Sequence, residues 1–142
     1  MLATLIPVLT TSENHSDLRE LTDRLINPYI DKAGHNKSFF VNEIPDHLQL
    51  CTDTQMFASV LSGLLSAIVS YTRDSCIRMT AKVYGSVVLL KLKDSNSSDI
   101  YGIEAEVQKF KPLAEKIRGS VHVTNQRKKL TTITFGFPNL SL

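Results

Sequence analysis

The sequence has few features that would place it outside the cell, in a membrane or on nucleic acid. Its two cysteines, Cys51 and Cys76, lie in apolar strand-like runs, and we interpret them as reduced core residues. The formal net charge of +2 is too small to favour nucleic acid. No uninterrupted apolar run approaches the roughly 18 residues of a membrane span, and Met1 is not followed by a signal-peptide pattern. We therefore expect a cytoplasmic protein with no membrane insertion and no nucleic-acid partner.

The motifs of several enzyme classes are absent as well. The sequence contains no P-loop and no nucleophile elbow. His35, His47 and His122 are isolated and lack the close spacing of His, Cys or carboxylate ligands that a metal site needs. His15 lies in "NHSDLREL", which we interpret as the start of a helix. These histidines therefore indicate neither a metal site nor a catalytic one.

The order of the expected elements predicts the fold class. No repeat, low-complexity tract or linker divides the sequence, so residues 1–142 should form a single domain. Strand patterns cover residues 4–10, 37–44, 47–52, 76–84, 86–93, 120–125 and 130–137. Helical patterns cover residues 18–33 (interrupted near Pro28), 54–72 (capped by Asp53 or Thr54) and about 103–117, where Gly119 marks the end. Hairpins dominate this order, which predicts an α+β fold. We expect a two-layer sandwich whose mixed, mostly antiparallel sheet is covered on one face by three helices.

The helical segment "SVLSGLLSAIVSYT", residues 59–72, has an unusual composition on the face turned away from its apolar side. That second face carries small, uncharged residues, namely Ser59, Ser62, Gly63, Ser66, Ala67 and Ser70. A helix with one solvated face normally presents charged residues there. This face is therefore expected to be covered, either as the closed floor of a pocket, by a partner, or by packing within the domain.

The element order and three strings resemble the ATP-binding catalytic domain of sensor histidine kinases, in the superfamily of DNA gyrase, Hsp90 and MutL. "MFASVLSGLLSAIVSYT", which follows Asp53, is similar to the family helix "NLl.NAi.yT" that opens the nucleotide site. "LLKLKDSNSSD" is similar to the hairpin ending in "DxGxG", and "LTTITFGFP" to the closing strand "GTxFxfxLP". The resemblance covers about residues 9–138 and implies the Bergerat-type ATPase fold.

The resemblance also implies a site for ATP and Mg²⁺, whose motifs are degenerate here. Asp94 matches the aspartate that accepts a hydrogen bond from adenine, Thr131 matches a threonine that touches adenine, and Tyr71 closes the helix motif. The alternatives that Asp94 is an ordinary polar strand end, and Thr131 an ordinary β-branched strand residue, stay open.

Several matched positions lack the chemistry that the family needs. The asparagine that ligates Mg²⁺ matches Ala67, the asparagine one turn earlier matches Gly63, and a phosphate-binding basic residue matches Ser70. Two family glycines match Asn96 and Ser98. Glu104 and Glu106 are expected at the start of the next helix, where their charge would repel phosphate.

These differences favour a degenerate domain that neither binds nor hydrolyses ATP and has no cofactor. Losing three contacts of about 1–3 kcal/mol each would weaken a micromolar site to about millimolar or weaker. Such a domain would act as an interaction module in bacterial two-component signalling. Its partner would be a response regulator, a kinase dimerisation domain or a second copy of the chain.

Two other readings remain open, and with them the question of whether the chain is an enzyme. One is a divergent but functional ATP-binding catalytic domain of a two-component sensor histidine kinase, sustained by Asp94, Tyr71 and Thr131. The other is a histidine phosphotransfer protein with a decayed ATPase domain. That protein needs a helical element with an acceptor histidine, whereas His15 is followed by Ser16 and not directly by an acid.

Overall fold

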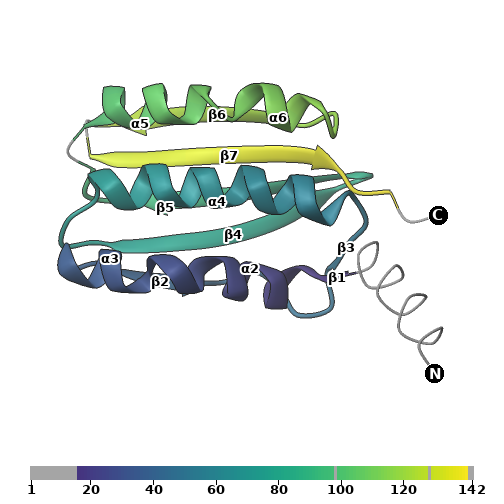
Figure 1. The fold of residues 1–142 in the computed structure, drawn as a ribbon, viewed down its shortest axis with the longest axis horizontal. Helices are drawn as coiled ribbons and strands as arrows, with labels where there is room; N and C mark the ends of the chain where they lie inside the picture. Colours follow the sequence, from purple (N-terminus) through teal and green to yellow (C-terminus); the bar gives the residue numbers. More distant parts are fainter. Residues whose placement is uncertain (1–15, 98, 128, 141–142) are drawn as a thin grey trace.

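A computed structural model describes residues 16–97, 99–127 and 129–140 of the chain. The expected strand at residues 4–10, His15 and Ser98 lie outside these residues. Figure 1 shows a sheet with all of the described helices on one of its sides. The predicted α+β sandwich of two layers is therefore confirmed.

The first helical segment is divided at Pro28, as predicted. α2 (Leu18–Ile26) is capped by Asp17, whose carboxylate accepts a hydrogen bond from the backbone N–H of Glu20 at 3.1 Å. The 3₁₀-helix η2 (Asn27–Tyr29) contains the proline, and α3 (Ile30–His35) follows. Because proline lacks an N–H and clashes with the preceding turn, it does not continue a regular α-helix.

The main sheet has five strands in the order β2, β4, β5, β7, β6. These are β2 (Phe39–Asn42), β4 (Cys76–Tyr84), β5 (Val87–Asp94), β7 (Leu130–Pro138) and β6 (Ser120–Gln126). Only β2 and β4 are parallel, so the sheet is mixed and mostly antiparallel. The β4–β5 hairpin turns at Gly85, whose φ of 61° is easily adopted only by glycine.

The segment around residue 50 does not join this sheet. It contributes only β3 (Gln49–Leu50), which pairs with β1 (Ser16–Asp17) in a separate two-stranded sheet. Asn139 ties this small sheet to the end of β7, because its side chain accepts from the N–H of Cys51 at 2.6 Å and donates to the carbonyl of Gln49 at 2.8 Å.

The remaining helices are α4 (Thr54–Tyr71), α5 (Ile100–Gln108) and α6 (Lys111–Glu115). Asp53 caps α4, as expected, by accepting from the N–H of Met56 at 3.0 Å. The helix expected over about 103–117 is in fact two helices, and the first begins three residues earlier than predicted. The left-handed residue after α6 is Arg118, with φ 59°, and not Gly119.

α4 is the central helix of the core. Its buried residues pack on the sheet, where the rings of Phe57, Phe135 and Phe137 form a cluster with centroids 5.0–5.7 Å apart. Contrary to the sequence-based expectation, α4 is long and apolar enough to cross a membrane by length and composition alone. Half of that stretch is buried within the domain, as in the core helix of a globular fold.

The expectation that both cysteines are core residues is wrong. Cys51 and Cys76 are free thiols, but both are partly exposed and neither belongs to the buried core. Each lies at the edge of an apolar run, where the strand pattern of the sequence alone does not reveal how far it is covered.

Candidate functional site

Two of the residues expected to hold a nucleotide meet at one end of the sheet. Asp94 is the last residue of β5 and Thr131 is the second residue of β7, and the two are directly opposite each other in the antiparallel ladder. Both side chains are fully buried. The two residues that the motifs single out therefore lie next to each other in the sheet.

The carboxylate of Asp94 is used within the chain. One of its oxygens accepts from the backbone N–H of Asn96 at 3.0 Å, and the other accepts from the hydroxyl of Ser97 at 3.1 Å. Thr131 also has a partner inside the domain, because its hydroxyl oxygen accepts from the side-chain amide of Asn125 at 2.9 Å. The carboxylate of Asp94 and the hydroxyl of Thr131 thus both have hydrogen-bond partners within the chain.

The short loop after β5, which includes Asn96 and Ser97, forms hydrogen bonds with two neighbouring segments. The N–H of Ser97 donates to the carbonyl of Lys129 at 3.1 Å, and Ser97 forms an isolated antiparallel bridge with Thr72 at the end of α4. The side-chain amide of Asn96 donates to the carbonyl of Arg73 at 2.7 Å. This loop therefore lies across the gap between α4 and the sheet end that carries Asp94.

Helix α5 packs closely on the end of α4. A Cβ added to Gly102 would lie 2.5 Å from the ring of Tyr71, so that only a glycine fits beneath this ring. Tyr71 is thus in contact with α5, rather than lining an open cleft. Because α5 directly follows the short loop after β5, α4 and α5 are neighbours at the end of the sheet where the family places its nucleotide.

The acidic group at the N-terminus of α5 is not the predicted one. Asp99 caps the helix by accepting from the N–H of Gly102 at 3.0 Å. Glu104 and Glu106 lie beyond the first turn, and Glu106 forms an ion pair with Lys109 at 2.9 Å. The expectation that these two glutamates face a phosphate at the helix terminus is therefore wrong, because the helix begins earlier than its apolar pattern indicates.

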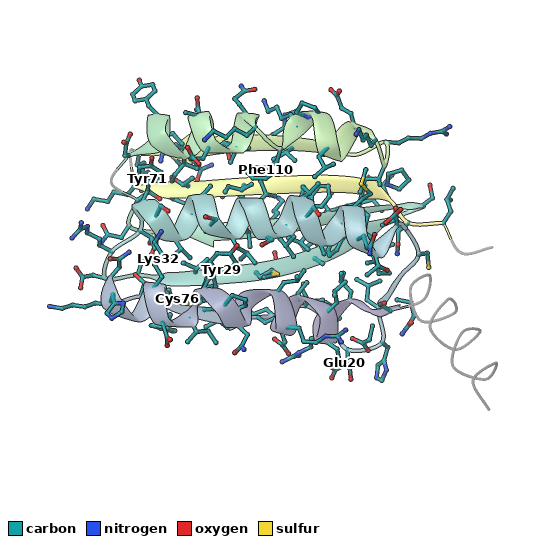
Figure 2. All side chains as sticks on the ribbon, viewed as in Figure 1. Glu20, Tyr29, Lys32, Tyr71, Cys76 and Phe110 are labelled. Atoms are coloured by element: carbon teal, nitrogen blue, oxygen red, sulfur yellow. The ribbon has the colours of Figure 1, made fainter. Side chains whose placement is uncertain are left out.

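Two side chains from neighbouring segments, Tyr29 and Phe110, contact the small-residue face of α4 (Figure 2). The ring of Phe110, at the break between α5 and α6, lies where any Cβ at Gly63 would be. From η2, the hydroxyl of Tyr29 lies 3.0 Å from the carbonyl of Ser62 and 2.7 Å from its hydroxyl. Ala67 is 2% exposed. Gly63 and Ala67 are therefore covered by packing inside the domain, whereas Ser59 and Ser70 on the same face are exposed and Ser62 and Ser66 are half-buried.

A cation is present beside the position where the family has a basic residue. The ammonium group of Lys32, on α3, donates to the hydroxyl of Ser70 at 3.1 Å, and Ser70 itself donates to the carbonyl of Ser66 at 2.8 Å. Lys32, Phe110, Tyr29 and Asn125 were not identified from the sequence. No spacing rule links these residues to α4 or β7, because their contacts depend on how distant elements pack.

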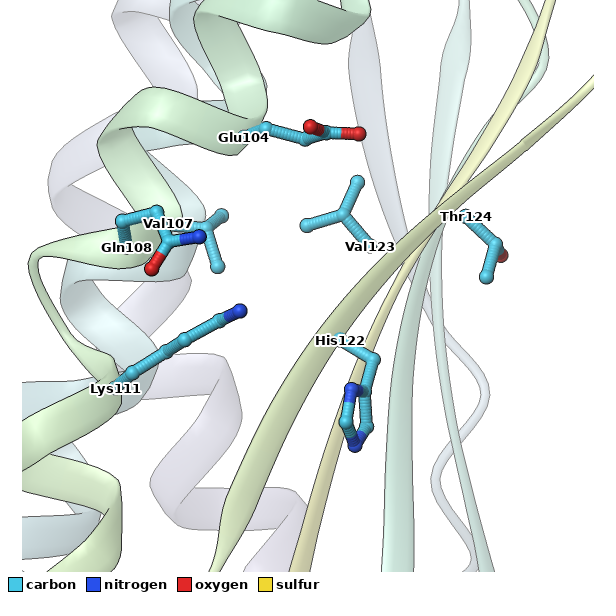
Figure 3. A pocket seen from close by; sticks show the side chains of 7 residues that line it. All are labelled: Glu104, Val107, Gln108, Lys111, His122, Val123 and Thr124. Atoms are coloured by element: carbon cyan, nitrogen blue, oxygen red, sulfur yellow. The ribbon is translucent and has the colours of Figure 1, made fainter.

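Two hollows lie near these helices. The first, about 580 Å³, is an open groove over α4 lined by Leu25, Tyr29, Ala58, Ser59, Ser62, Gly63, Ser66 and Phe110. The second, about 380 Å³, lies between α5, α6 and β6 and is lined by Glu104, Val107, Gln108, Lys111, His122, Val123 and Thr124 (Figure 3). Neither contains Asp94, Tyr71 or Thr131. Within the described ranges, no group of three His, Cys, Asp or Glu residues could hold a metal ion.

No protein-family model matches the chain, and no curated protein matches its sequence. Solved structures, in contrast, do match it. The catalytic domain of the histidine kinase ThkA aligns with a TM-score of 0.72 at 15% identity, over 88% of this chain and 95% of that domain. The chain has the fold of the catalytic ATPase domain of sensor histidine kinases.

Two larger histidine kinases share this fold. The Acinetobacter baumannii histidine kinase AdeS aligns with a TM-score of 0.77 at 12% identity, over 89% of this chain and 67% of that one. Full-length ShkA, solved in complex with AMPPNP, aligns with a TM-score of 0.76 at 13% identity, over 90% of this chain and 32% of ShkA. The histidine kinase resemblance seen in the motifs is thus confirmed at the level of the fold.

The residues present do not fit the Mg²⁺ ion that the family site implies. Magnesium prefers several oxygen ligands in a near-octahedral arrangement. Gly63 and Ala67, at the matched positions, have no side-chain oxygen, and the ring of Phe110 covers Gly63.

Proposed function

We propose that this chain is a degenerate ATPase-fold domain of the sensor histidine kinase type, which binds no ATP at the family site. It acts as a cytoplasmic interaction module in bacterial two-component signalling. The observation that carries this proposal is the state of Asp94, which is fully buried with a hydrogen bond from its own loop on each carboxylate oxygen. Because Asp94 is fully buried and Ser97 of its own loop contacts its carboxylate, adenine would reach this group only after the loop had moved.

The packing of α4 supports the same proposal. Phe110 occupies the space over Gly63, and Tyr71 is in close contact with α5 at Gly102. A nucleotide between α4 and α5 would have to separate these contacts and expose apolar surface to water. That cost adds to the loss of metal and phosphate ligands, so even weak ATP binding is disfavoured.

A protein partner is supported by one of the structural neighbours. ThkA has been solved in complex with the response regulator TrrA, and that complex aligns with a TM-score of 0.70 at 16% identity, over 98% of this chain and 47% of the ThkA chain. The cytoplasmic segment of the histidine kinase QseC is another neighbour. We propose a response regulator as the class of partner for this chain.

Calorimetric titration with ATP and with ADP, with and without Mg²⁺, tests the first part of this proposal. The catalytic domain of ThkA is the matched control, because it has the same fold. We expect no heat of binding and no thermal shift for this chain up to millimolar nucleotide. Magnesium-dependent binding near micromolar concentrations would overturn the proposal.

One observation favours the alternative of a divergent but functional ATP-binding catalytic domain. The ammonium group of Lys32 restores a positive charge next to Ser70, where the family has a phosphate-binding base. If this alternative holds, ATP binding is measurable in the same titration and Lys32→Ala weakens it. The absence of binding in the unmodified chain rejects this alternative directly.

A further inference from the structure

The face of the main sheet opposite the helices is not covered by any described element (Figure 1). Along each strand, the residues that are buried under the helices alternate with residues that point to the other side. On β4 the buried positions are Ile77, Met79 and Ala81, so Arg78, Thr80, Lys82 and Tyr84 lie on the open face. The register extends this face over Val87, Leu89, Lys91 and Lys93 of β5, and over Thr132, Thr134, Gly136 and Pro138 of β7.

The charged residues that the strands place on this open face are all basic. Its charged strand residues are Arg78, Lys82, Lys91 and Lys93, and no residue of the five described strands places an Asp or Glu there. The chain as a whole has 16 basic and 14 acidic residues, so the two signs are segregated. Glu43, just after β2, pairs with Arg78 at 3.2 Å; in the described part of the chain, no carboxylate pairs with Lys82, Lys91 or Lys93.

The register increases the repulsion between these cations. Arg78 and Lys93 are directly opposite each other on neighbouring strands, and like charges in that position destabilise a sheet. Lys91 lies directly between Thr80 and Thr134, whose hydroxyl groups are available as hydrogen-bond donors. A carboxylate bound at this face would relieve the repulsion and would accept from both kinds of group.

The same face carries apolar residues at the end near the β4–β5 turn. Tyr84 is 57% exposed and Val87 is 37% exposed, and the two are paired across the hairpin. The chain after β7 runs close to this turn, because the N–H of Asn139 donates to the carbonyl of Ser86 at 2.7 Å, and the next residue, Leu140, is 56% exposed. Exposed aromatic and aliphatic residues grouped in this way are typical anchors of a protein–protein interface.

We infer that the open face of the β4–β5–β7 sheet binds an acidic surface of a partner protein. Acidic residues would oppose Lys82, Lys91 and Lys93, while Tyr84 and Val87 bury apolar contacts at one end. The inference rests on the proposed function in one respect, namely that the domain works by binding another protein. It does not depend on where a nucleotide would bind, because this face is on the opposite side of the sheet from α4 and α5.

The composition of the face favours a protein over nucleic acid. Sheets that bind single-stranded nucleic acid stack bases on aromatic side chains at the centre of the sheet. Here the central positions hold Leu89, Lys91 and Thr134, and Tyr84 lies at the corner beside aliphatic residues. Val87 would gain nothing from a phosphate backbone, whereas a protein could bury it together with Tyr84.

A short poly-L-glutamate peptide is the probe for this surface, with the amide resonances of the ¹⁵N-labelled domain as the readout. We expect salt-sensitive shifts that are concentrated in β4, β5 and β7. The test variant is Lys91→Glu with Lys93→Glu, which should weaken binding about tenfold. The control is Arg24→Glu with Lys116→Glu, which makes the same change of charge at an exposed position of α2 and at the exposed residue after α6, and should change the affinity less than about twofold.

The outcomes separate this inference from the proposed function. Shifts outside the sheet, no binding, or an equal loss in the test and control variants would each overturn the inference, while the ATP titration decides the proposed function independently. A DNA oligonucleotide or phosphatidylserine vesicles that bind this face more tightly than the peptide would also overturn it, because they indicate a different class of partner. Circular dichroism of each variant confirms that the comparison is made between folded proteins.

Discussion

Gly63 is the position where the packing of α4 can be tested most directly. Changing it to alanine should add about 1 kcal/mol of intrinsic helix stability. However, the new methyl group would lie inside the ring of Phe110, which must then leave its place on α4. Overpacking of this kind costs about 1–3 kcal/mol. We therefore expect Gly63→Ala to lower the free energy of unfolding by about 1 kcal/mol, although the residue lies in the middle of an 18-residue helix.

A double-mutant cycle with Phe110→Ala shows whether the ring of Phe110 causes the loss of stability in Gly63→Ala. Without the ring, Gly63→Ala should stabilise the protein by about 1 kcal/mol, so that the coupling energy between the two sites is about 2 kcal/mol. Urea unfolding followed by far-ultraviolet circular dichroism measures all four proteins, since the sequence has no tryptophan to follow by fluorescence. A stabilising Gly63→Ala in the presence of Phe110 would refute the reasoning, because the ring would then move without cost.

Substitutions at three further positions test polar groups that are buried or half-buried. Thr72→Val should raise the free energy of unfolding by about 1 kcal/mol, because the buried Thr72 hydroxyl has no hydrogen-bond partner among the described residues; a lower melting temperature contradicts this. Asp94→Ala should lower the free energy of unfolding by about 2–3 kcal/mol. Asp94→Asn should lower it clearly less, because the amide can still form a hydrogen bond with the hydroxyl of Ser97. Equal decreases for the two variants in chemical denaturation would exclude this explanation. Tyr29→Phe should cost about 1 kcal/mol through its lost bonds to Ser62, and an unchanged urea midpoint would show that they contribute nothing.

Local signals predicted the parts of the fold that depend on local chemistry. Gly85 between two alternating segments predicted the β4–β5 hairpin, and Pro28 predicted the division of the first helix. The family motifs also assigned Asp94 and Thr131 to one expected site, and the two residues are opposite each other in the ladder. Each local signal extends over only a few neighbouring residues, so it can be recognised from the sequence without knowledge of the fold.

The errors were of two kinds, namely helix boundaries whose local signals were overlooked and contacts between elements that are distant in the sequence. The start of α5 was assigned from its apolar spacing, although Asp99 is a good N-cap and would have placed the boundary correctly. Pro112, in the first turn of α6, marks the start of a second helix after the break. No such local signal exists for Phe110 on Gly63, because that contact forms only when α5 and α6 pack on α4.

The link made by Asn139 has a consequence for how the domain can be rearranged. Because Asn139 bonds Gln49 and Cys51, and Gln49 pairs with Asp17, the described chain begins and ends at one corner of the fold. A short flexible linker could therefore join the two ends without stretching the sheet. A circular permutant opened in the exposed loop at residues 45–47 should keep every strand of the main sheet intact, and would allow the domain to be inserted into a loop of another protein.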